Sequence, residues 1–248
     1  MRVCSFFIVG ALAALPAAAG EPYMGDPAEG ARIATELRIL RPAADTNWTG
    51  VIRLSRSGKP TVEIPVSCYV FVEPTRWRSV YNTSKTTDGP AEKLEITRFT
   101  DGSTQYLYSI SSTGVALPTE PEQLKGQEAS IPFAGSDFYL SDLGMEFLQW
   151  PTQLLQTGQM RRGQPCYVLD SINPNPGNGA YARVRSWIPK EYFGILTAEA
   201  YDENGRLLKE FNAGSFIKDA AGNYQLKDMK IRSVPDRSRT EIRFDISK

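Results

Sequence analysis

Residues 135–151 read GSDFYLSDLGMEFLQWP, and this stretch decides how the rest of the chain is organised. It is an aromatic-rich break between two strand-rich parts. Ser141 or Asp142 is expected to cap a short helix, because a side-chain oxygen there can accept a free N–H group of the first turn. The helix is expected to end at Trp150, since a residue that precedes proline avoids the helical region.

The helix expected in this stretch has one apolar face, because Leu143, Phe147 and Leu148 recur at helical spacing. Two alternatives follow. The helix either plugs one end of a sheet as ordinary core or forms the edge of an apolar ligand cavity.

The first 19 residues have the pattern of a secretory signal peptide. Arg2 is the basic start, Val3–Leu15 is mostly apolar, and Ala17-Ala18-Ala19 offers small residues for cleavage near Ala19. The alternative is an uncleaved anchor, but the apolar run is short for a bilayer span. The mature chain, residues 20–248, is therefore expected outside the cytoplasm.

The composition excludes several classes of function. The 248 residues contain no histidine, so a Ser-His-Asp triad, a Cys-His pair and a histidine-liganded zinc site are all excluded. The 28 basic residues balance 28 acidic ones and are scattered, which is not the footprint of a nucleic-acid binder.

Two cysteines, Cys68 and Cys166, remain once the leader with Cys4 is removed. An even pair in an oxidising compartment could form a disulfide. The alternative is two separate buried thiols, since free cysteine packs like a small apolar residue. The sequence leaves both open.

The mature chain opens with a helix, because Asp26 can cap it and Pro27 suits its first position. After Trp48 the apolar period changes to two, which predicts strands. Pro65 lacks an N–H and predicts an edge strand or a bulge. The further strands expected are 77–81, 94–99, 105–110, 166–172, 181–188, 195–201, 206–216, 224–232 and 240–246.

Two further stretches stand out. Leu196, Ala198 and Ala200 place small residues on one strand face, which leaves room for a helix or a ligand beside the sheet. Residues 111–134 read as a long irregular connection. The fold class expected is mainly β (α+β), with a single large curved antiparallel sheet, an open half-barrel, whose concave face is covered by helices.

Several motifs resemble the outer-membrane lipoprotein-sorting proteins, the LolA-like superfamily of periplasmic lipoprotein carriers. The most specific is Gly135-Ser136-Asp137-Phe138, followed by Asp142-Leu143. The others are Trp48-Thr49-Gly50, Gly163-Gln164-Pro165-Cys166-Tyr167-Val168-Leu169, Trp187-Ile188-Pro189-Lys190, Ala198-Glu199-Ala200-Tyr201-Asp202 and Leu226-Lys227-Asp228-Met229.

This resemblance implies one carrier domain over residues 20–248, located in the periplasm. It implies a monomer without cofactor or metal that binds acyl-chain or lipoprotein cargo and is not an enzyme. An inner-membrane export complex would be the donor of the cargo, and contact with a membrane surface would be transient. The candidate cavity residues are Ile52, Leu54, Val62, Ile64, Val66, Phe138, Leu143, Phe147 and Leu148.

Two other functions are weighed against a carrier. The same fold could be a secreted interaction or sensor module that adds a partner's strand to its sheet edge. Alternatively, a pair of carboxylates could hydrolyse glycosides. The acids available for that chemistry are Asp137, Asp142, Glu191, Asp202 and Glu203.

Overall fold

The computed structural model describes residues 24–84, 86, 89–111, 121–177, 179–218 and 224–246. The predicted signal peptide therefore lies outside the described residues, as do residues 112–120 of the expected irregular connection. The helices are α1 (Pro27–Arg38), α2 (Leu140–Gly144) and the short 3₁₀ helices η1 (Gly126–Ala129), η2 (Phe133–Gly135) and η3 (Glu146–Gln149).

The described residues form mainly strands. In chain order these are β1 (Thr46–Arg56), β2 (Val62–Glu73), β3 (Arg76–Thr83), β4 (Glu92–Phe99), β5 (Thr104–Ile110), β6 (Glu122–Leu124), β7 (Thr152–Arg161), β8 (Gln164–Ile172), β9 (Arg183–Pro189), β10 (Thr197–Tyr201), β11 (Leu207–Ala213), β12 (Phe216–Lys218), β13 (Tyr224–Leu226), β14 (Asp228–Ser233) and β15 (Ser238–Phe244).

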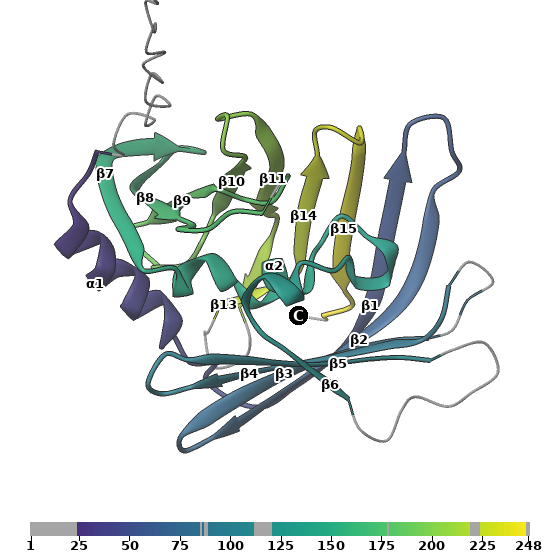
Figure 1. Cartoon of the computed structure of the whole chain (residues 1–248). Coiled ribbons are helices and arrows are strands. Elements are labelled where there is room, and N and C mark those ends of the chain that lie inside the picture. Colours follow the sequence, from purple (N-terminus) through teal and green to yellow (C-terminus); the bar gives the residue numbers. More distant parts are fainter. Residues whose placement is uncertain are drawn as a thin grey trace, which may run out of the picture.

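Among the described residues, 13 strands form one antiparallel sheet in the order β6-β5-β4-β3-β2-β1-β15-β14-β11-β10-β9-β8-β7. The sheet is curved and open, and the segment that contains α2 lies against its concave side (Figure 1). The predicted fold class is confirmed. β12 and β13 pair separately as a small hairpin.

The sequence did not predict β6 or β7. β6 has only three residues, which is too short for an alternation to be recognised. β7 is longer, but its register with β8 shifts between Gln156 and Gln159. A bulge of this kind interrupts the period-two pattern on which recognition of a strand depends.

Helix α1 begins as its sequence predicts. Asp26 accepts hydrogen bonds from the N–H groups of Ala28 and Glu29 at 3.0 and 3.1 Å. Its buried face rests against β7. Gly30 permits this close packing, because a Cβ atom there would collide with the backbone of Gln153.

The central helix differs from its prediction. It is not one helix from Ser141 to Trp150, because Met145 takes a left-handed conformation (φ 54°) and separates α2 from η3. Tyr139 stands at the N-cap position expected for Ser141 or Asp142. Asp142 nevertheless satisfies the helix start from its third position, where it accepts the Tyr139 N–H at 2.8 Å.

Pro65 lies within the sheet without a bulge, since β2 pairs with β1 and β3. The ladder to β3 begins only at Val66, opposite Thr83. Pro65 therefore pairs with β1 but has no partner on the β3 side. Proline lacks the backbone N–H group, and its absence is tolerated where no neighbouring strand needs that hydrogen bond.

The concave face divides into two unequal parts. In the filled half, formed by β1–β5, β14 and β15, the sheet packs against Phe133, Phe138, Leu140 and Leu143 from the central segment. In the hollow half, formed by β7–β11, helix α1 and η3 cover only part of the sheet. None of the helices among the described residues has the length and hydropathy to cross a bilayer.

Candidate functional site

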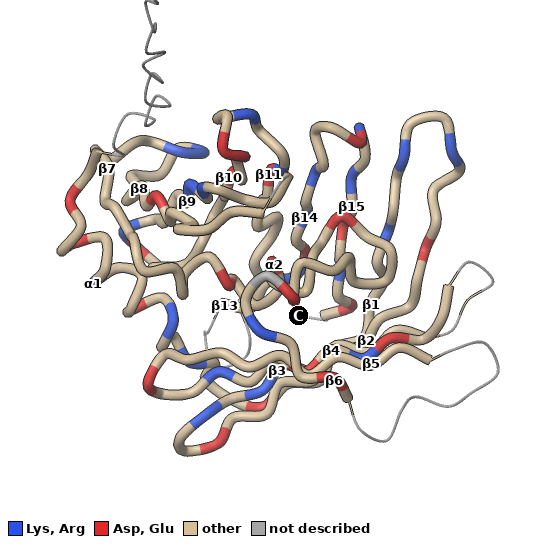
Figure 2. The backbone as a smooth tube through the Cα atoms, viewed as in Figure 1, with Lys and Arg blue, Asp and Glu red and all other residues tan. Residues whose placement is uncertain are grey.

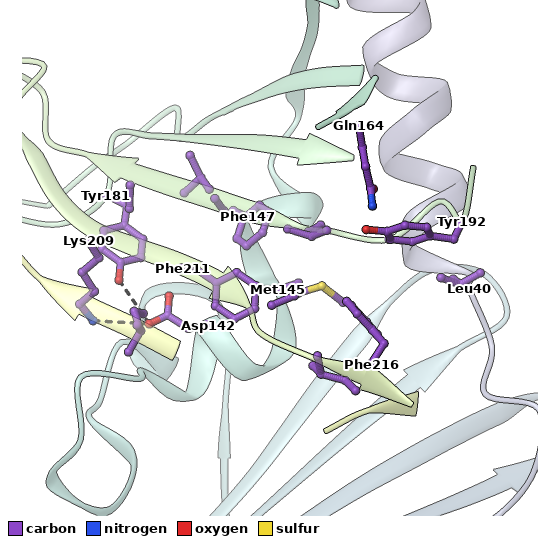
Figure 3. A pocket seen from close by; sticks show the side chains of 18 of the residues that line it. Leu40, Asp142, Met145, Phe147, Gln164, Tyr181, Tyr192, Lys209, Phe211 and Phe216 are labelled. Carbon is purple, nitrogen blue, oxygen red and sulfur yellow. Dashed lines mark hydrogen bonds and ion pairs between the residues drawn. The ribbon is translucent and has the colours of Figure 1, made fainter. Parts of the chain in front are cut away.

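A cavity of about 620 Å³ lies on the concave face of the hollow half. Figure 3 shows its walls converging from the central segment, β11 and β12. The lining is largely apolar and aromatic. It comprises Leu40, Asp142, Met145, Phe147, Gln164, Tyr181, Val184, Glu191, Tyr192, Gly194, Ile195, Ala198, Ala200, Lys209, Phe211, Ala213, Phe216, Leu226 and Ile231.

Small side chains on the sheet create this space. Ala198 and Ala200 on β10 and Ala213 on β11 line the cavity, and their small side chains leave the space above the sheet open. Met145 and Phe147 form that wall from the central segment. The prediction that small residues on this strand leave room beside the sheet is thus confirmed for Ala198 and Ala200.

The two ends of the cavity differ in chemistry. Asp142, Tyr181 and Lys209 lie at one end, and Leu40 and Phe216 form the apolar surface of the other, where Tyr192 and Gln164 also lie (Figure 3). The apolar end is accessible, because Leu40 is 53% exposed and Phe216 is 37% exposed. An elongated ligand could therefore enter at the apolar end and reach polar groups inside.

The polar end is built around the buried ammonium group of Lys209 on β11. Its Nζ atom is 3.4 Å from Asp142 Oδ2 and 3.0 Å from the centre of the Tyr139 ring, so both an ion pair and a cation–π contact hold it. Asp142 Oδ2 also accepts a hydrogen bond from the Tyr181 hydroxyl at 3.3 Å.

Burial shifts the pKa values of both Asp142 and Lys209. Desolvation raises the pKa of Asp142 and lowers the pKa of Lys209, while the attraction between the two charges opposes both shifts. Burial and the nearby Asp142 carboxylate raise the pKa of Tyr181 well above its usual value. Removal of one charge would therefore leave the other buried without compensation.

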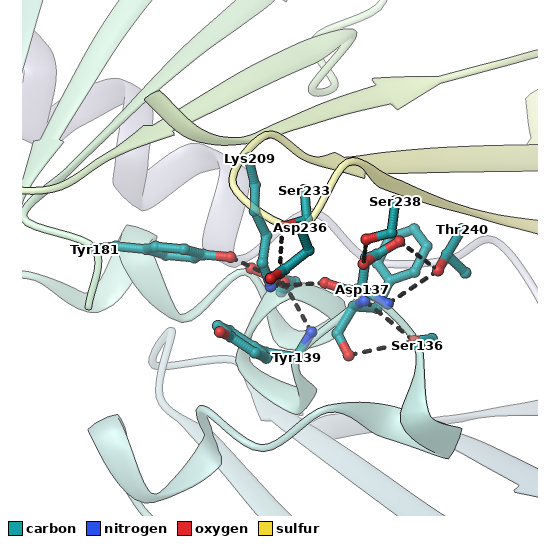
Figure 4. A network of polar contacts seen from close by, with 11 residues as sticks. Ser136, Asp137, Tyr139, Tyr181, Lys209, Ser233, Asp236, Ser238 and Thr240 are labelled. Atoms are coloured by element: carbon teal, nitrogen blue, oxygen red, sulfur yellow. Dashed lines mark hydrogen bonds and ion pairs between the residues drawn. The ribbon is translucent and has the colours of Figure 1, made fainter. Parts of the chain in front are cut away.

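A second polar network fixes the central segment to the sheet (Figure 4). The Asp137 carboxylate accepts hydrogen bonds from the hydroxyls of Ser238 and Thr240 on β15. Its backbone carbonyl accepts one from Lys209 Nζ at 2.6 Å. The Gly135 carbonyl accepts another from Arg56 of β1 at 2.7 Å. This part of the central segment is therefore held by three strands.

Of the nine candidate cavity residues, Phe147 alone is among those that line the cavity. Leu148 packs in the core beneath α1. The other candidates pack in the filled half, namely Ile52, Leu54, Val62, Ile64, Val66, Phe138 and Leu143. The candidate residues lie mostly on the strands with the strongest alternation, whereas the cavity lies over strand β10, whose inward residues are small.

Cys68 and Cys166 are free, buried thiols in the structure and lie in different hydrophobic clusters. No bond joins them there, and the alternative of two separate thiols describes their placement. Burial raises the pKa of Cys68 to about 12, which keeps it in the unreactive thiol form. Among the described residues, no group of three or more metal-binding side chains comes together.

Three of the five acids considered for glycoside hydrolysis are occupied by local contacts, and Glu203 is exposed on the turn before β11. Asp137 and Asp142 hold the central segment. Asp202 closes the turn before β11, where it accepts hydrogen bonds from the N–H groups of Asn204 and Arg206. Glu191 contributes to the cavity wall.

Comparison with known proteins identifies a family. The sequence profile of a family described as "Uncharacterized protein" matches residues 94–248, which is more than half of the chain. The chain belongs to this family. A search of the curated proteins gave no match.

Solved structures show the same fold. A DUF1329 family protein from Desulfovibrio piger has a TM-score of 0.67 at 19% identity, over 90% of this chain and 95% of its own. A putative outer membrane lipoprotein-sorting protein domain from Vibrio parahaemolyticus has a TM-score of 0.67 at 18% identity, over 89% and 92%. A LolA superfamily protein from Nitrosomonas europaea has a TM-score of 0.59 at 15% identity, over 89% and 92%.

The resemblance predicted from the sequence is thus confirmed at the level of fold. The chain has the fold of lipoprotein-sorting and LolA superfamily proteins, and the likeness extends over nearly all of its length.

Proposed function

We propose that this protein is a non-enzymatic carrier of a ligand with an acyl chain. The observation that supports this most strongly is the apolar cavity of about 620 Å³ on the concave face. Its volume falls within the range of about 300–1,000 Å³ that is usual for ligand sites. Each methylene group moved from water into such a cavity gains about 0.8 kcal/mol, so a lined cavity suits a soluble carrier of acyl chains.

The cavity also favours a carrier over the two alternatives. An interaction module needs an exposed edge but no internal volume, whereas here space remains open over the small residues of β10. A hydrolase needs a free pair of carboxylates, and Asp142 is already bound by Lys209 and by the Tyr139 N–H. Binding without a chemical step accounts for both features.

The biological setting belongs to the same proposal. The signal-peptide pattern of residues 1–19 favours a location in the periplasm. There, the mature domain of residues 20–248 would receive lipid or lipoprotein cargo at the inner membrane and shield its acyl chains on the way to the outer membrane. An export complex as donor, a monomeric state and transient membrane contact all follow from this role.

The test is native mass spectrometry of the mature protein purified without detergent, together with titration of an apolar fluorophore. We expect a bound lipid or lipopeptide and saturable fluorophore binding. Ala198→Phe should abolish both, because its ring would occupy the cavity. Ala31→Phe is the matched control, since it adds the same ring on the exposed face of α1.

Loss of binding in Ala198→Phe, with retention in Ala31→Phe, supports the proposal. A wild-type protein that never carries lipid and binds no fluorophore would refute it. Equal binding by wild type and Ala198→Phe would also refute it, because the ligand would then lie elsewhere.

A further inference from the structure

A second hollow, separate from the acyl-chain cavity, lies between the tips of two neighbouring hairpins, β1–β2 and β14–β15. Its volume is about 400 Å³. Figure 2 shows Lys and Arg positions on both tips. Among the described residues, no carboxylate lines this hollow; its lining is Ser55, Arg56, Ser57, Arg232, Ser233, Val234, Arg237, Ser238 and Arg239.

A row of paired residues further from the tips has alternating charges on neighbouring strands. On the outer face, Arg53 stands in register between Glu63 on β2 and Glu241 on β15. Glu241 in turn faces Lys230 on β14. The ion pairs Arg53–Glu63 and Lys230–Glu241 measure 2.7 and 3.6 Å. Each cation in this row therefore faces a carboxylate.

The row two residues closer to the tips departs from this arrangement. Arg239 stands in register between Ser55 and Arg232, so two arginines face each other across neighbouring strands. Like charges placed directly opposite destabilise a sheet. Glu210 neutralises Arg232 at 2.8 Å, whereas Arg239 has no carboxylate within ion-pair distance among the described residues.

The turn brings another cation to the same place. Arg237 occupies the β14–β15 turn with a left-handed backbone (φ 50°), which is uncommon for a residue other than glycine. Arg56 contributes from the opposite hairpin, where its Nη2 atom donates to the Gly135 carbonyl. Four arginines and four serines thus line one open space, in which the hydroxyls of Ser233 and Ser238 already donate to the carboxylates of Asp236 and Asp137.

We propose that this hollow binds the phosphate group of a phosphate ester, with Arg237 and Arg239 as its main ligands. A guanidinium group offers two parallel N–H donors that match two phosphate oxygens, and the hydroxyls of Ser55 and Ser57 supply further donors. A bound anion would also separate the facing charges of Arg232 and Arg239. The phosphate could belong to a free metabolite or to the headgroup of an anionic phospholipid.

The test uses the mature protein at low ionic strength with two probes. Calorimetry with inorganic phosphate examines the free anion, and co-sedimentation with vesicles of phosphatidylglycerol, compared with phosphatidylcholine, examines the headgroup. The variant is Arg237→Gln/Arg239→Gln, in which both changes are exposed. The control is Arg243→Gln, an exposed arginine of the same strand that is paired with Glu241 at 2.6 Å.

Binding of either probe should fall about tenfold or more in the double variant, which corresponds to the loss of one charge-assisted hydrogen bond. Arg243→Gln should bind like the wild type. A loss seen with both probes indicates a general phosphate site, and a loss confined to phosphatidylglycerol vesicles indicates a headgroup site. If neither probe binds the wild type, or if the double variant binds as well as Arg243→Gln, the proposal is wrong.

Discussion

The filled half and the hollow half of the concave face belong to one continuous sheet, yet they are completed in opposite ways. In the filled half the central segment covers the sheet and packs Phe133, Phe138 and Leu140 against it, each no more than 1% exposed. In the hollow half the sheet presents Ala198 and Ala200, and a cavity of about 620 Å³ remains. The size of the inward side chains therefore decides which half supplies stability and which half can hold a ligand.

The boundary between the halves is strand β11. Phe211 packs against the cores of both halves, and Lys209 holds the central segment through the Asp137 carbonyl and the Asp142 carboxylate. A buried ion pair is weak evidence for stability in itself, but it can specify one arrangement of the elements it joins. Here it fixes the segment that separates filled space from empty space.

The largest expected effect contrasts one aromatic residue from each half. Phe138→Ala should lower the free energy of unfolding by about 3–5 kcal/mol, because it opens a cavity in a closed core. Phe216→Ala should change it by less than about 1 kcal/mol, since Phe216 is 37% exposed at the cavity mouth. Urea denaturation of both variants measures the difference. Similar losses in both would show that the two halves are equally packed.

Lys209→Met tests the boundary and has a distinct pH dependence. At pH 7 it should cost about 3–5 kcal/mol, because Asp142 is left as an unpaired buried charge. Burial raises the pKa of Asp142, and without Lys209 that pKa rises further. The folded state then binds a proton before the unfolded state does, so the variant regains stability as pH falls toward about 3.9, the unfolded value.

Urea denaturation of Lys209→Met between pH 7 and pH 5 checks this. The double variant Lys209→Met/Asp142→Asn is the control, because it has no carboxylate at this position and should not regain stability in the same way. A loss in Lys209→Met that is independent of pH would mean that the ammonium group does not compensate Asp142.

The smallest expected effect comes from adding volume rather than removing it. Ala129, which is fully buried in the filled half, should tolerate phenylalanine poorly, with a loss of about 1–3 kcal/mol from overpacking. Ala200→Phe should cost less than about 1 kcal/mol, because its ring has the cavity to enter. Thermal unfolding compares the two. An equal loss would mean that the space above Ala200 is closed to side chains of this size.

Local features were predicted well from sequence. The Asp26-Pro27 start of α1 depends on hydrogen bonds between residues two and three positions apart, so the residues that determine it are adjacent in the chain. The alternation in β1, β2 and β15 identified these strands for the same reason. Strand β7 was missed, because the shift of register within it is defined only by its pairing with β8.

The candidate site was predicted in kind but not in place. The sequence indicated an apolar cavity beside a half-barrel and drew attention to Ala198 and Ala200, but its candidate residues fall mostly in the filled half. The inward residues of a strand show the same alternation in the sequence whether they pack against the central segment or face the cavity. The side chain opposite comes from a segment far away in the chain, and the pattern contains no information on it.

By itself, the sequence determined the absence of histidine chemistry, the antiparallel strand pattern and the capped first helix, because composition, period and capping are properties of neighbouring residues. Only the tertiary structure decided where the cavity lies, which partner Lys209 has, and that Arg232 and Arg239 face each other at the hairpin tips. These features depend on register and on contacts between distant strands. Curvature of the sheet brings together the inward side chains of the cavity and of the Lys209 site, whereas strand register places Arg232 opposite Arg239 on the outer face.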